Sequence, residues 1–275
     1  MECWLLSPGN RRPSLVSLAG ATGLHIHDIT LRSGACFQLF VEKSSQVVIE
    51  ELTIAAGCGF KQAPNTDGIH LQSVRDASVR DSSITNGDDC VVVSGDSSDV
   101  HVQRVHCRCS AGAAVVMPWA TSSGHNIIDG VSFVDIVAFN TSHCAGIKSE
   151  AQYTGAVSNV RFENIACTMT SWFAFYVNPF NQSGAQLEPG AFSAENVTWQ
   201  NTSVAVTGDP NPGHFWCAPG QCRGLQSDNV QVTGTSKQYL CDGAQVSGNS
   251  VDSAPRACFA APLKAGMRCF RWKHR

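Results

Sequence analysis

Charged residues are scarce in this chain, since they make up 15% of its 275 residues and give a formal net charge of −3. Coiled coils and long solvated helical bundles carry more charge, so this composition argues against both. A basic face for nucleic acid has no support, and no uninterrupted apolar run reaches the roughly 18 residues of a membrane-spanning helix. We therefore expect neither a nucleic-acid partner nor a membrane partner. Hydrophobic residues reach 43%, which suffices for a large core and excludes global disorder.

The sequence also lacks a C-x-x-C motif, although it contains 13 cysteines. The closest two, Cys107 and Cys109, are separated by one residue, which suits tetrahedral zinc poorly. We therefore expect no metal centre and several disulfides, with one cysteine left over. Four N-x-S/T sequons also indicate an oxidising, secretory destination, at Asn140, Asn181, Asn196 and Asn201.

No signal peptide is recognisable at the start of the chain. Residues 1–13 lack a basic segment followed by an apolar one, and a secretory signal requires both. Either the N-terminus is incomplete or the protein stays inside the cell. Because the cysteines and sequons favour secretion, we expect a secreted, extracellular protein whose N-terminus is incomplete.

An eight-residue pattern recurs along the chain: apolar, polar, apolar, polar, Asp or Asn, two variable residues, and apolar. Its copies start at Leu24, Val47, Ala77, Val100, Val131, Val160, Val197 and, less clearly, Val230. A second apolar stretch lies between successive copies. Alternation with period two predicts strands, and one motif repeated at a variable interval is typical of a solenoid rather than a sandwich. The sequence therefore predicts an all-β fold, a right-handed parallel β-helix, with Asp and Asn stacked at the bends.

No linker interrupts the repeat, although the chain becomes loop-rich over residues 208–224. We expect one β-helix domain over residues 1–255. Residues 256–275 carry no repeat, and we expect them to be a C-terminal cap or a disordered tail. We expect the protein to be a monomer.

Two acidic motifs lie about one coil apart. The first reads N-T-D-G-I at residues 65–69, and the second reads N-G-D-D-C at residues 86–90. Asp beside Gly is common in turns, so a single motif would have a structural explanation. Asp67 and Asp88 are 21 residues apart, however, which should stack both motifs at one corner of the solenoid. Clustered carboxylates repel one another and tend to be functional, either as general acid and base or as a site for a divalent cation.

These motifs resemble those of the family 28 glycoside hydrolases, which include polygalacturonases and rhamnogalacturonases. The family shares N-T-D, then G-D-D-C, then C-x-x-G-H-G, then R-I-K. Residues 65–67 and 87–90 keep the first two motifs. Ala113 stands at the histidine position of the third motif, and Gly146 stands at the arginine position of the fourth, which retains Lys148. The resemblance covers roughly residues 4–255, and it implies that the β-helix domain is missing N-terminal coils.

The resemblance implies a role for each site residue and no cofactor. Asp88 is similar to the general acid that protonates the leaving oxygen, and Asp67 and Asp89 are similar to the pair that deprotonates water. The family inverts the anomeric centre, which requires carboxyls about 6.5–9.5 Å apart. Lys148 would bind a galacturonate carboxylate. The alternative explanation is that Lys148 is an ordinary solvated lysine. The substrate-binding residues implied are Asn65, Gly87 and Lys148.

The substrate implied is the pectin backbone, either polygalacturonan or rhamnogalacturonan. The rhamnogalacturonase branch also lacks the histidine and the arginine, and residues 110–115 and 146–149 are similar to its sequences. Asp89 instead matches the polygalacturonases, because that branch has glutamate there. Without the arginine, a neutral or rhamnose-containing subsite is physically reasonable.

Two alternative functions stay open. The first is a catalytically inactive carbohydrate-binding β-helix, which the residues Ala113 and Gly146 favour. The second is a calcium-dependent pectate lyase, which would need an arginine base near the acids. Arg75 and Arg80 are near in sequence, but their neighbours lack the patterns of a lyase.

The resemblance also suggests disulfides. Cys90 and Cys107 match a family disulfide beside the acids, and Cys144 and Cys167 are either partners or buried thiols. The expected pairs are Cys90–Cys107, Cys217–Cys222 and Cys241–Cys258. Among the aromatic residues, Trp119, Trp172 and Tyr176 are candidates for stacking on sugars, whereas the alternation of Phe173, Phe175 and Val177 favours the core.

Overall fold

The computed structural model describes residues 12–58, 63–117, 125–149, 154–179 and 192–248. These residues form two long sheets and contain no helix. The described chain therefore has no helix long and apolar enough to cross a membrane. The expected C-terminal cap at 256–275, Trp119 and the sequon at Asn181 lie outside the described residues.

The first sheet has nine strands, which follow one another in chain order. They are β1 (Val16–Ala19), β4 (Leu39–Glu42), β7 (Ile69–Gln72), β9 (Val91–Ser94), β11 (Gly112–Met117), β13 (His143–Ser149), β15 (Phe175–Pro179), β17 (Gly213–Trp216) and β19 (Leu240–Asp242). Every strand pairs in parallel with its neighbours in this order. This nine-stranded sheet carries the candidate site.

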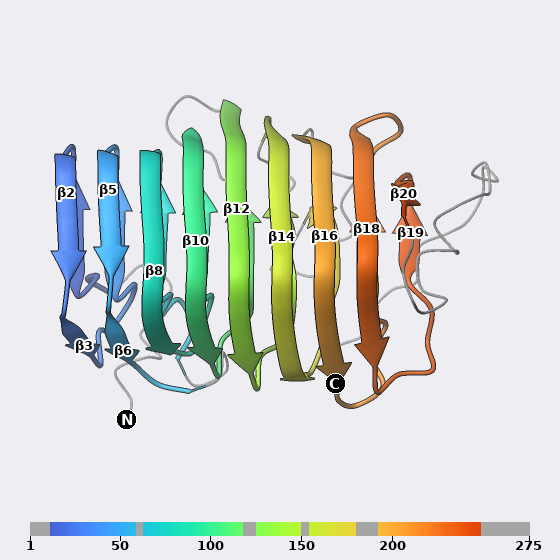
Figure 1. The fold of residues 1–275 in the computed structure, drawn as a ribbon, viewed down its shortest axis with the longest axis horizontal. Helices are drawn as coiled ribbons and strands as arrows, with labels where there is room; N and C mark the ends of the chain where they lie inside the picture. Colours follow the sequence, from blue (N-terminus) through green and yellow to red (C-terminus); the bar gives the residue numbers. More distant parts are fainter. Residues whose placement is uncertain (1–11, 59–62, 118–124, 150–153, 180–191, 249–275) are drawn as a thin grey trace.

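The second sheet has eleven strands, and Figure 1 shows its long strands side by side. They are β2 (Thr22–His27), β5 (Ser45–Glu50), β8 (Arg75–Thr85), β10 (Ser97–Arg108), β12 (His125–Phe139), β14 (Thr154–Thr170), β16 (Phe192–Val206), β18 (Cys222–Thr233) and β20 (Val246–Ser247), with β3 (Thr30–Arg32) and β6 (Thr53–Ala55) beside them. The chain alternates between the two sheets, so each coil adds one parallel strand to each. The fold is the predicted right-handed parallel β-helix.

The predicted repeat is the register of the eleven-stranded sheet. The first residues of seven copies of the repeat pair with one another from coil to coil as Cα partners: Leu24, Val47, Ala77, Val100, Val131, Val160 and Val197. The eighth start, at Val230, is wrong, because Val230 pairs with Thr202 while Leu225 pairs with Val197. The copy at Leu225 was hidden because the buried polar residue Ser227 occupies its third position, where other copies are apolar.

Asparagine and aspartate stack at the bends, as predicted. Asn159 and Asn196 have φ values of 55° and 54°, in the left-handed region that asparagine tolerates better than most residues. The Asn196 Nδ2 donates to Asn159 Oδ1 at 2.6 Å, and the Asn164 Nδ2 donates to Asp135 Oδ1 at 3.1 Å. These side chains therefore bend the strands and also link successive coils.

Aromatic rings stack along the interior of the helix. The ring centroids of Phe133 and Phe162 are 5.5 Å apart, and those of Phe162 and Trp199 are 5.6 Å apart, with interplanar angles of 16° and 15°. All three side chains are fully buried. Phe175 packs against the same Trp199 ring, which confirms its predicted place in the core.

Four disulfides join described residues. Two were expected, Cys90–Cys107 and Cys217–Cys222. Cys144 and Cys167 form a disulfide, so they are partners and not buried thiols. Cys58–Cys109 was missed, because 51 residues separate two loop cysteines and no repeat places them together. The expected pair Cys241–Cys258 stays a prediction, since Cys258 lies outside the described residues.

We expect removal of the Cys90–Cys107 disulfide to lower the free energy of unfolding. In the double variant Cys90→Ala/Cys107→Ala, the bond no longer restricts a loop of 17 residues in the unfolded chain. A loop of this length corresponds to about 3 kcal/mol. Urea denaturation measures the loss, and Cys36→Ala, at the free cysteine of the described chain, is the control. An unchanged unfolding free energy would contradict the prediction.

Candidate active site

The structure brings the three predicted carboxylates together. Asp67 precedes β7, and Asp88 and Asp89 precede β9, the neighbouring strand of the same sheet. The Gly68 amide donates to the Asp89 carbonyl at 2.9 Å, which fixes the two turns side by side. One carboxylate oxygen from each aspartate lies within 4.8 Å of the others, and all three residues are buried. The stacking of the two motifs at one corner is therefore confirmed.

The separation of carboxyl groups that inversion requires, about 6.5–9.5 Å, stays a prediction. The 4.8 Å limit describes the nearest oxygens of the three groups, whose turns are directly hydrogen-bonded, and it does not give the separation of whole carboxyl groups.

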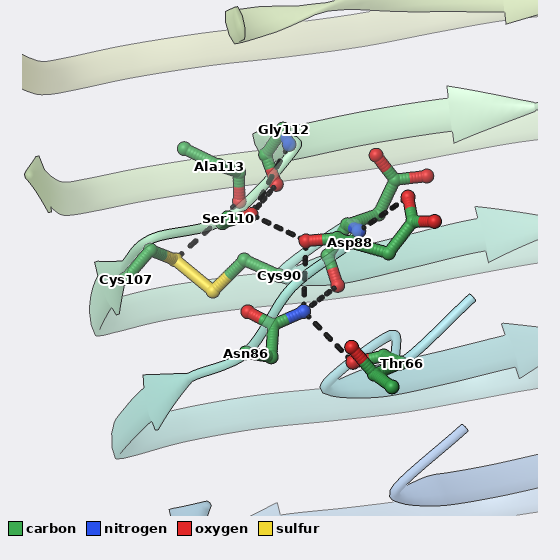
Figure 2. The surroundings of a disulfide bond; sticks show 9 residues. Thr66, Asn86, Asp88, Cys90, Cys107, Ser110, Gly112 and Ala113 are labelled. Carbon is green, nitrogen blue, oxygen red and sulfur yellow. Dashed lines mark hydrogen bonds between the residues drawn. A yellow bond between two sulfur atoms is a disulfide. The ribbon is translucent and has the colours of Figure 1, made fainter. Parts of the chain in front are cut away.

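A buried asparagine joins the two acidic motifs (Figure 2). The Asn86 Nδ2 donates to the carbonyls of Thr66, Asp88 and Asp89, at 3.0, 2.8 and 2.8 Å. Sequence reasoning gave Asn86 no role. Its position is explained only by the folded turns, where one amide satisfies three carbonyls on two coils.

Gly87 lies where a side chain does not fit. A Cβ there would lie 2.5 Å from the Ala63 carbonyl oxygen. The Gly87 amide donates to the Thr66 Oγ1 at 2.9 Å, and that hydroxyl donates to the Ala63 carbonyl at 2.6 Å. These contacts explain the glycine structurally, and its contact with substrate stays a prediction.

Asp88 accepts two backbone hydrogen bonds. Its Oδ2 accepts from the amide of Asn65 at 2.6 Å, and its Oδ1 accepts from the amide of Asp89 at 3.0 Å. Burial nevertheless raises the pKa of Asp88 well above its usual value, and the charges of Asp89 and Asp67 raise it further. Asp88 is therefore held in place and favours the protonated form.

Asp67 belongs to a hydrogen-bonded chain that sequence reasoning missed. The His70 Nδ1 lies 2.8 Å from Asp67 Oδ2, and the His70 Nε2 lies 2.9 Å from Ser94 Oγ. Burial lowers the pKa of His70 to about 4, so the imidazole is neutral near pH 7. Burial and the charge of Asp89 raise the pKa of Asp67 well above its usual value. The available signal was a histidine three residues after the aspartate, on the following strand.

Lys148 lies on β13, within 2.5 Å of Asp89 Oδ2. Burial lowers the pKa of Lys148, but the charges of Asp89, Tyr176 and Asp88 and the hydrogen bond to Asp89 together outweigh burial, and the resulting pKa is above the usual value. Lys148 is therefore a cation beside the carboxyl group of Asp89. Lys148 is not the ordinary solvated lysine of the alternative explanation.

Ala113 and the preceding Gly112 face opposite ways. Ala113 lies in the hydrophobic core, next to the disulfide of Cys90 and Cys107. Because neighbouring residues of a strand face opposite sides, the preceding Gly112 faces the acids, and its Cβ would lie 3.0 Å from Asp89 Oδ1. Figure 2 shows both residues beside the disulfide. A histidine at 113 would therefore enter the core rather than the site.

Comparisons with known proteins identify the family. The sequence profile of "Glycosyl hydrolases family 28" matches residues 2–253. The chain belongs to this family. A "Probable endopolygalacturonase D" of Neosartorya fischeri is 30% identical over 215 residues, which are 73% of this chain and 44% of the relative. A "Probable exopolygalacturonase X" of Aspergillus terreus is 27% identical over 87% of this chain and 60% of the relative. This family 28 chain thus spans about half the length of the curated relatives that it matches.

Solved structures share the fold of this family 28 chain. The endo-xylogalacturonan hydrolase of Aspergillus tubingensis has a TM-score of 0.74 at 20% identity and covers 87% of this chain and 69% of its own. Endopolygalacturonase I of Stereum purpureum, complexed with two galacturonates, has a TM-score of 0.72 at 16% identity and covers 88% of this chain and 73% of its own. These similarities support the parallel β-helix.

Proposed function

We propose that this family 28 chain hydrolyses glycosidic bonds of the pectin backbone, in polygalacturonan or rhamnogalacturonan. The observation that carries the proposal is the cluster of Asp67, Asp88 and Asp89, whose oxygens lie within 4.8 Å of one another. Such a cluster keeps some carboxyls protonated and others ionised, which general acid and base catalysis requires. The names of the curated relatives support the same activity.

The contacts of the three aspartates, taken together with the resemblance, support different roles. Burial raises the pKa of Asp88 and of Asp67 alike, and the resemblance assigns to Asp88 the proton for the leaving oxygen. Asp89 is paired with Lys148, and Asp67 lies beside it. Asp89 and Asp67 therefore orient and deprotonate the attacking water. No cofactor takes part in this scheme.

The stereochemical outcome is inversion in this proposal, as the resemblance implies. A retaining enzyme would instead use one of the aspartates as the nucleophile. Proton NMR of the first product decides between the two, because it reports the anomer before mutarotation. The inverted anomer is expected, and the retained anomer would assign one aspartate as a nucleophile.

The alternative functions have less support. Ala113 faces the core, so the missing histidine no longer argues for an inactive site. Gly146 is the remaining argument for a binding protein. Arg75 and Arg80, the candidate lyase bases, lie on β8 in the other sheet, where Arg80 donates to Glu50 at 2.6 Å. This position argues against the lyase.

We also infer that the protein acts outside the cell as a monomer. Four disulfides among the described residues fit an oxidising compartment. Localisation of the tagged chain tests the first inference, and light scattering tests the second.

The central experiment measures release of reducing ends by the purified chain. Polygalacturonan and rhamnogalacturonan are offered side by side, with and without EDTA. Cleavage that survives EDTA and disappears in Asp88→Asn supports the hydrolase, and the preferred polymer names the substrate. Binding without cleavage by the folded protein would overturn the proposal in favour of the inactive binding protein.

His70→Phe is expected to move the acidic limb of the pH profile of kcat/KM upward by about one pH unit. The neutral His70 donates its Nδ1 proton to ionised Asp67 and stabilises the charge, so removal of the donor raises the pKa of Asp67. The charges of Asp89 and Lys148, which also face Asp67, remain.

His70→Asn is the matched control, because its amide retains a hydrogen-bond donor. Its acidic limb should therefore move upward less than that of His70→Phe. A purely structural role for His70 predicts lower activity with an unmoved limb in both variants. That result would contradict the positioning role of His70.

A further inference from the structure

Three large hydrophobic side chains are exposed together at the ends of β12 and β14. Val137, Phe139 and Met169 are 47%, 40% and 45% exposed, and they are three of the six large hydrophobic residues exposed in the described chain. Val137 and Phe139 are two residues apart on β12, so they share its outer face. The two strands are neighbours in Figure 1, and Phe139 pairs in register with Thr168, the residue before Met169. We call these three side chains the β12 patch.

The β12 patch surrounds an asparagine that begins a glycosylation sequon. Asn140 follows Phe139 directly, is exposed, and starts the sequence N-T-S of residues 140–142. Its backbone amide donates to the carbonyl of Thr168 at 2.9 Å, which aligns it with Met169 of the next coil. Asn140 and Met169 occupy the same bend, with φ values of 57° and 56°. Asn140 therefore has Phe139 beside it along the chain and Met169 beside it across the coils.

The side chain of Asn140 takes no part in the stacked asparagines of the other bends. At Asn196, the Nδ2 donates to Asn159 Oδ1 at 2.6 Å, so a second amide holds the nitrogen. Asn140 instead has Cys109 and Met169 on its two sides, and neither carries an amide. Its Nδ2 donates to Cys109 Sγ at 3.7 Å, and sulfur is a weak acceptor. The nitrogen that an N-linked sugar occupies is therefore held only weakly at Asn140.

A sugar attached to this nitrogen meets an apolar surface. The first sugar of an N-linked glycan would lie one residue from the Phe139 ring, and one face of a pyranose ring consists of C–H groups. Packing of that face on Phe139 removes apolar surface of both groups from water. Phe139 projects from the eleven-stranded sheet, whereas the acidic cluster precedes strands of the nine-stranded sheet. The contact thus lies on a different sheet from the candidate active site.

We propose that Asn140 carries an N-linked glycan and that its first sugar covers Phe139 and the rest of the β12 patch. The sugar donor is a lipid-linked oligosaccharide diphosphate of the secretory pathway. The bond between the sugar C1 and the phosphate oxygen breaks, a bond between C1 and Nδ2 forms, the amide loses one proton, and the lipid diphosphate leaves. The proposal rests on the inferred secretion and is independent of the hydrolase function.

The covering glycan also accounts for the exposed side chains. Contiguous apolar patches on a protein surface mark places that contact another molecule. A glycan is bulky and polar on its outer side, so it shields such a patch and keeps the surface soluble. The β12 patch is therefore the contact surface of a covalently attached sugar, which makes a separate protein partner unnecessary there.

Glycopeptide mass spectrometry tests the modification. The full chain is secreted from a eukaryotic host behind an added secretion signal, so that each sequon meets the transferase. We expect a glycan on Asn140. A secreted chain with Asn140 unmodified would overturn the proposal.

Urea denaturation of the secreted protein tests the contact. Asn140→Asp removes the acceptor, keeps the size of the side chain and tolerates the left-handed φ. We expect the midpoint of denaturation to fall by about 0.3–0.5 M relative to the glycosylated parent. Trimming of the glycan to its first sugar should leave the midpoint unchanged. Asn201→Asp, at another sequon where Asn229 donates to Asn201 Oδ1 at 2.9 Å, is the matched control and should change little.

A second background separates the contact from other effects of the substitution. In Phe139→Thr, the ring is absent, so Asn140→Asp should leave the midpoint nearly unchanged. An equal loss with and without the ring would overturn the covering of Phe139 by the sugar. An unchanged midpoint in Asn140→Asp itself would overturn it as well.

Discussion

Asp88→Asn is expected to lower kcat on pectic polymers by about 10²–10⁴-fold, the usual contribution of a general acid. The substitution removes the proton that Asp88 would give to the leaving oxygen. The side chain keeps its size. Its remaining oxygen still accepts one of the two backbone hydrogen bonds that the amides of Asn65 and Asp89 donate. Release of reducing ends at saturating substrate measures the loss.

The same variant should fold as well as the parent at neutral pH. Because the folded state raises the pKa of Asp88, its contribution to stability is present at low pH and is lost as pH rises through the raised value. A neutral amide avoids this loss. Asp99→Asn is the matched control, since Asp99 lies on β10 with φ 54°, which asparagine accepts. More than a tenth of parental activity in Asp88→Asn would contradict the assignment.

Trp199→Ala is expected to reduce the free energy of unfolding by about 3–5 kcal/mol, the range for large aromatic residues in cores. Trp199 is fully buried, stacks on Phe162, and meets Phe215 edge to face at 5.5 Å between centroids. Its indole nitrogen also donates to the Ala145 carbonyl at 3.4 Å, which links the two sheets. Removal therefore leaves a cavity between coils.

Urea denaturation followed by circular dichroism measures this loss. Trp199→Phe should retain much of the stacking and cost less. Trp216→Ala, which removes a half-buried indole, should cost less still. A cost below about 1 kcal/mol for Trp199→Ala would contradict the importance of the stack, since core truncations of this size exceed it.

The sequence predicted the coils well because their physics is local and repeated. Alternation marks each strand, and parallel stacking then places Val100 on Ala77 and Val131 on Val100 without further information. The same argument predicted the meeting of Asp67 with Asp88, since both motifs sit at the same point of adjacent coils. Only the copy at Leu225, which has the polar residue Ser227 at its third position, was placed wrongly.

The site was predicted less completely, because its contacts run across coils or depend on one residue of register. A shift of one residue reverses the face of a strand, and this reversal separates Gly112, at the acids, from Ala113, in the core. The role of His70 depends on Ser94, 24 residues away on the next strand. No pattern along the chain indicates such a partner.

The stacking of coils also determines how the molecule opens. Each coil is held mainly by its two neighbours, so strands peel away from the ends of the stack one interface at a time. The carboxylates lie in the turns just before β7 and β9, with further coils on both sides, and Lys148 lies on β13. Opening of β1 or β19 therefore leaves these groups in register. Catalytic geometry is protected by depth along the axis of the solenoid, and a partly frayed molecule keeps an assembled site.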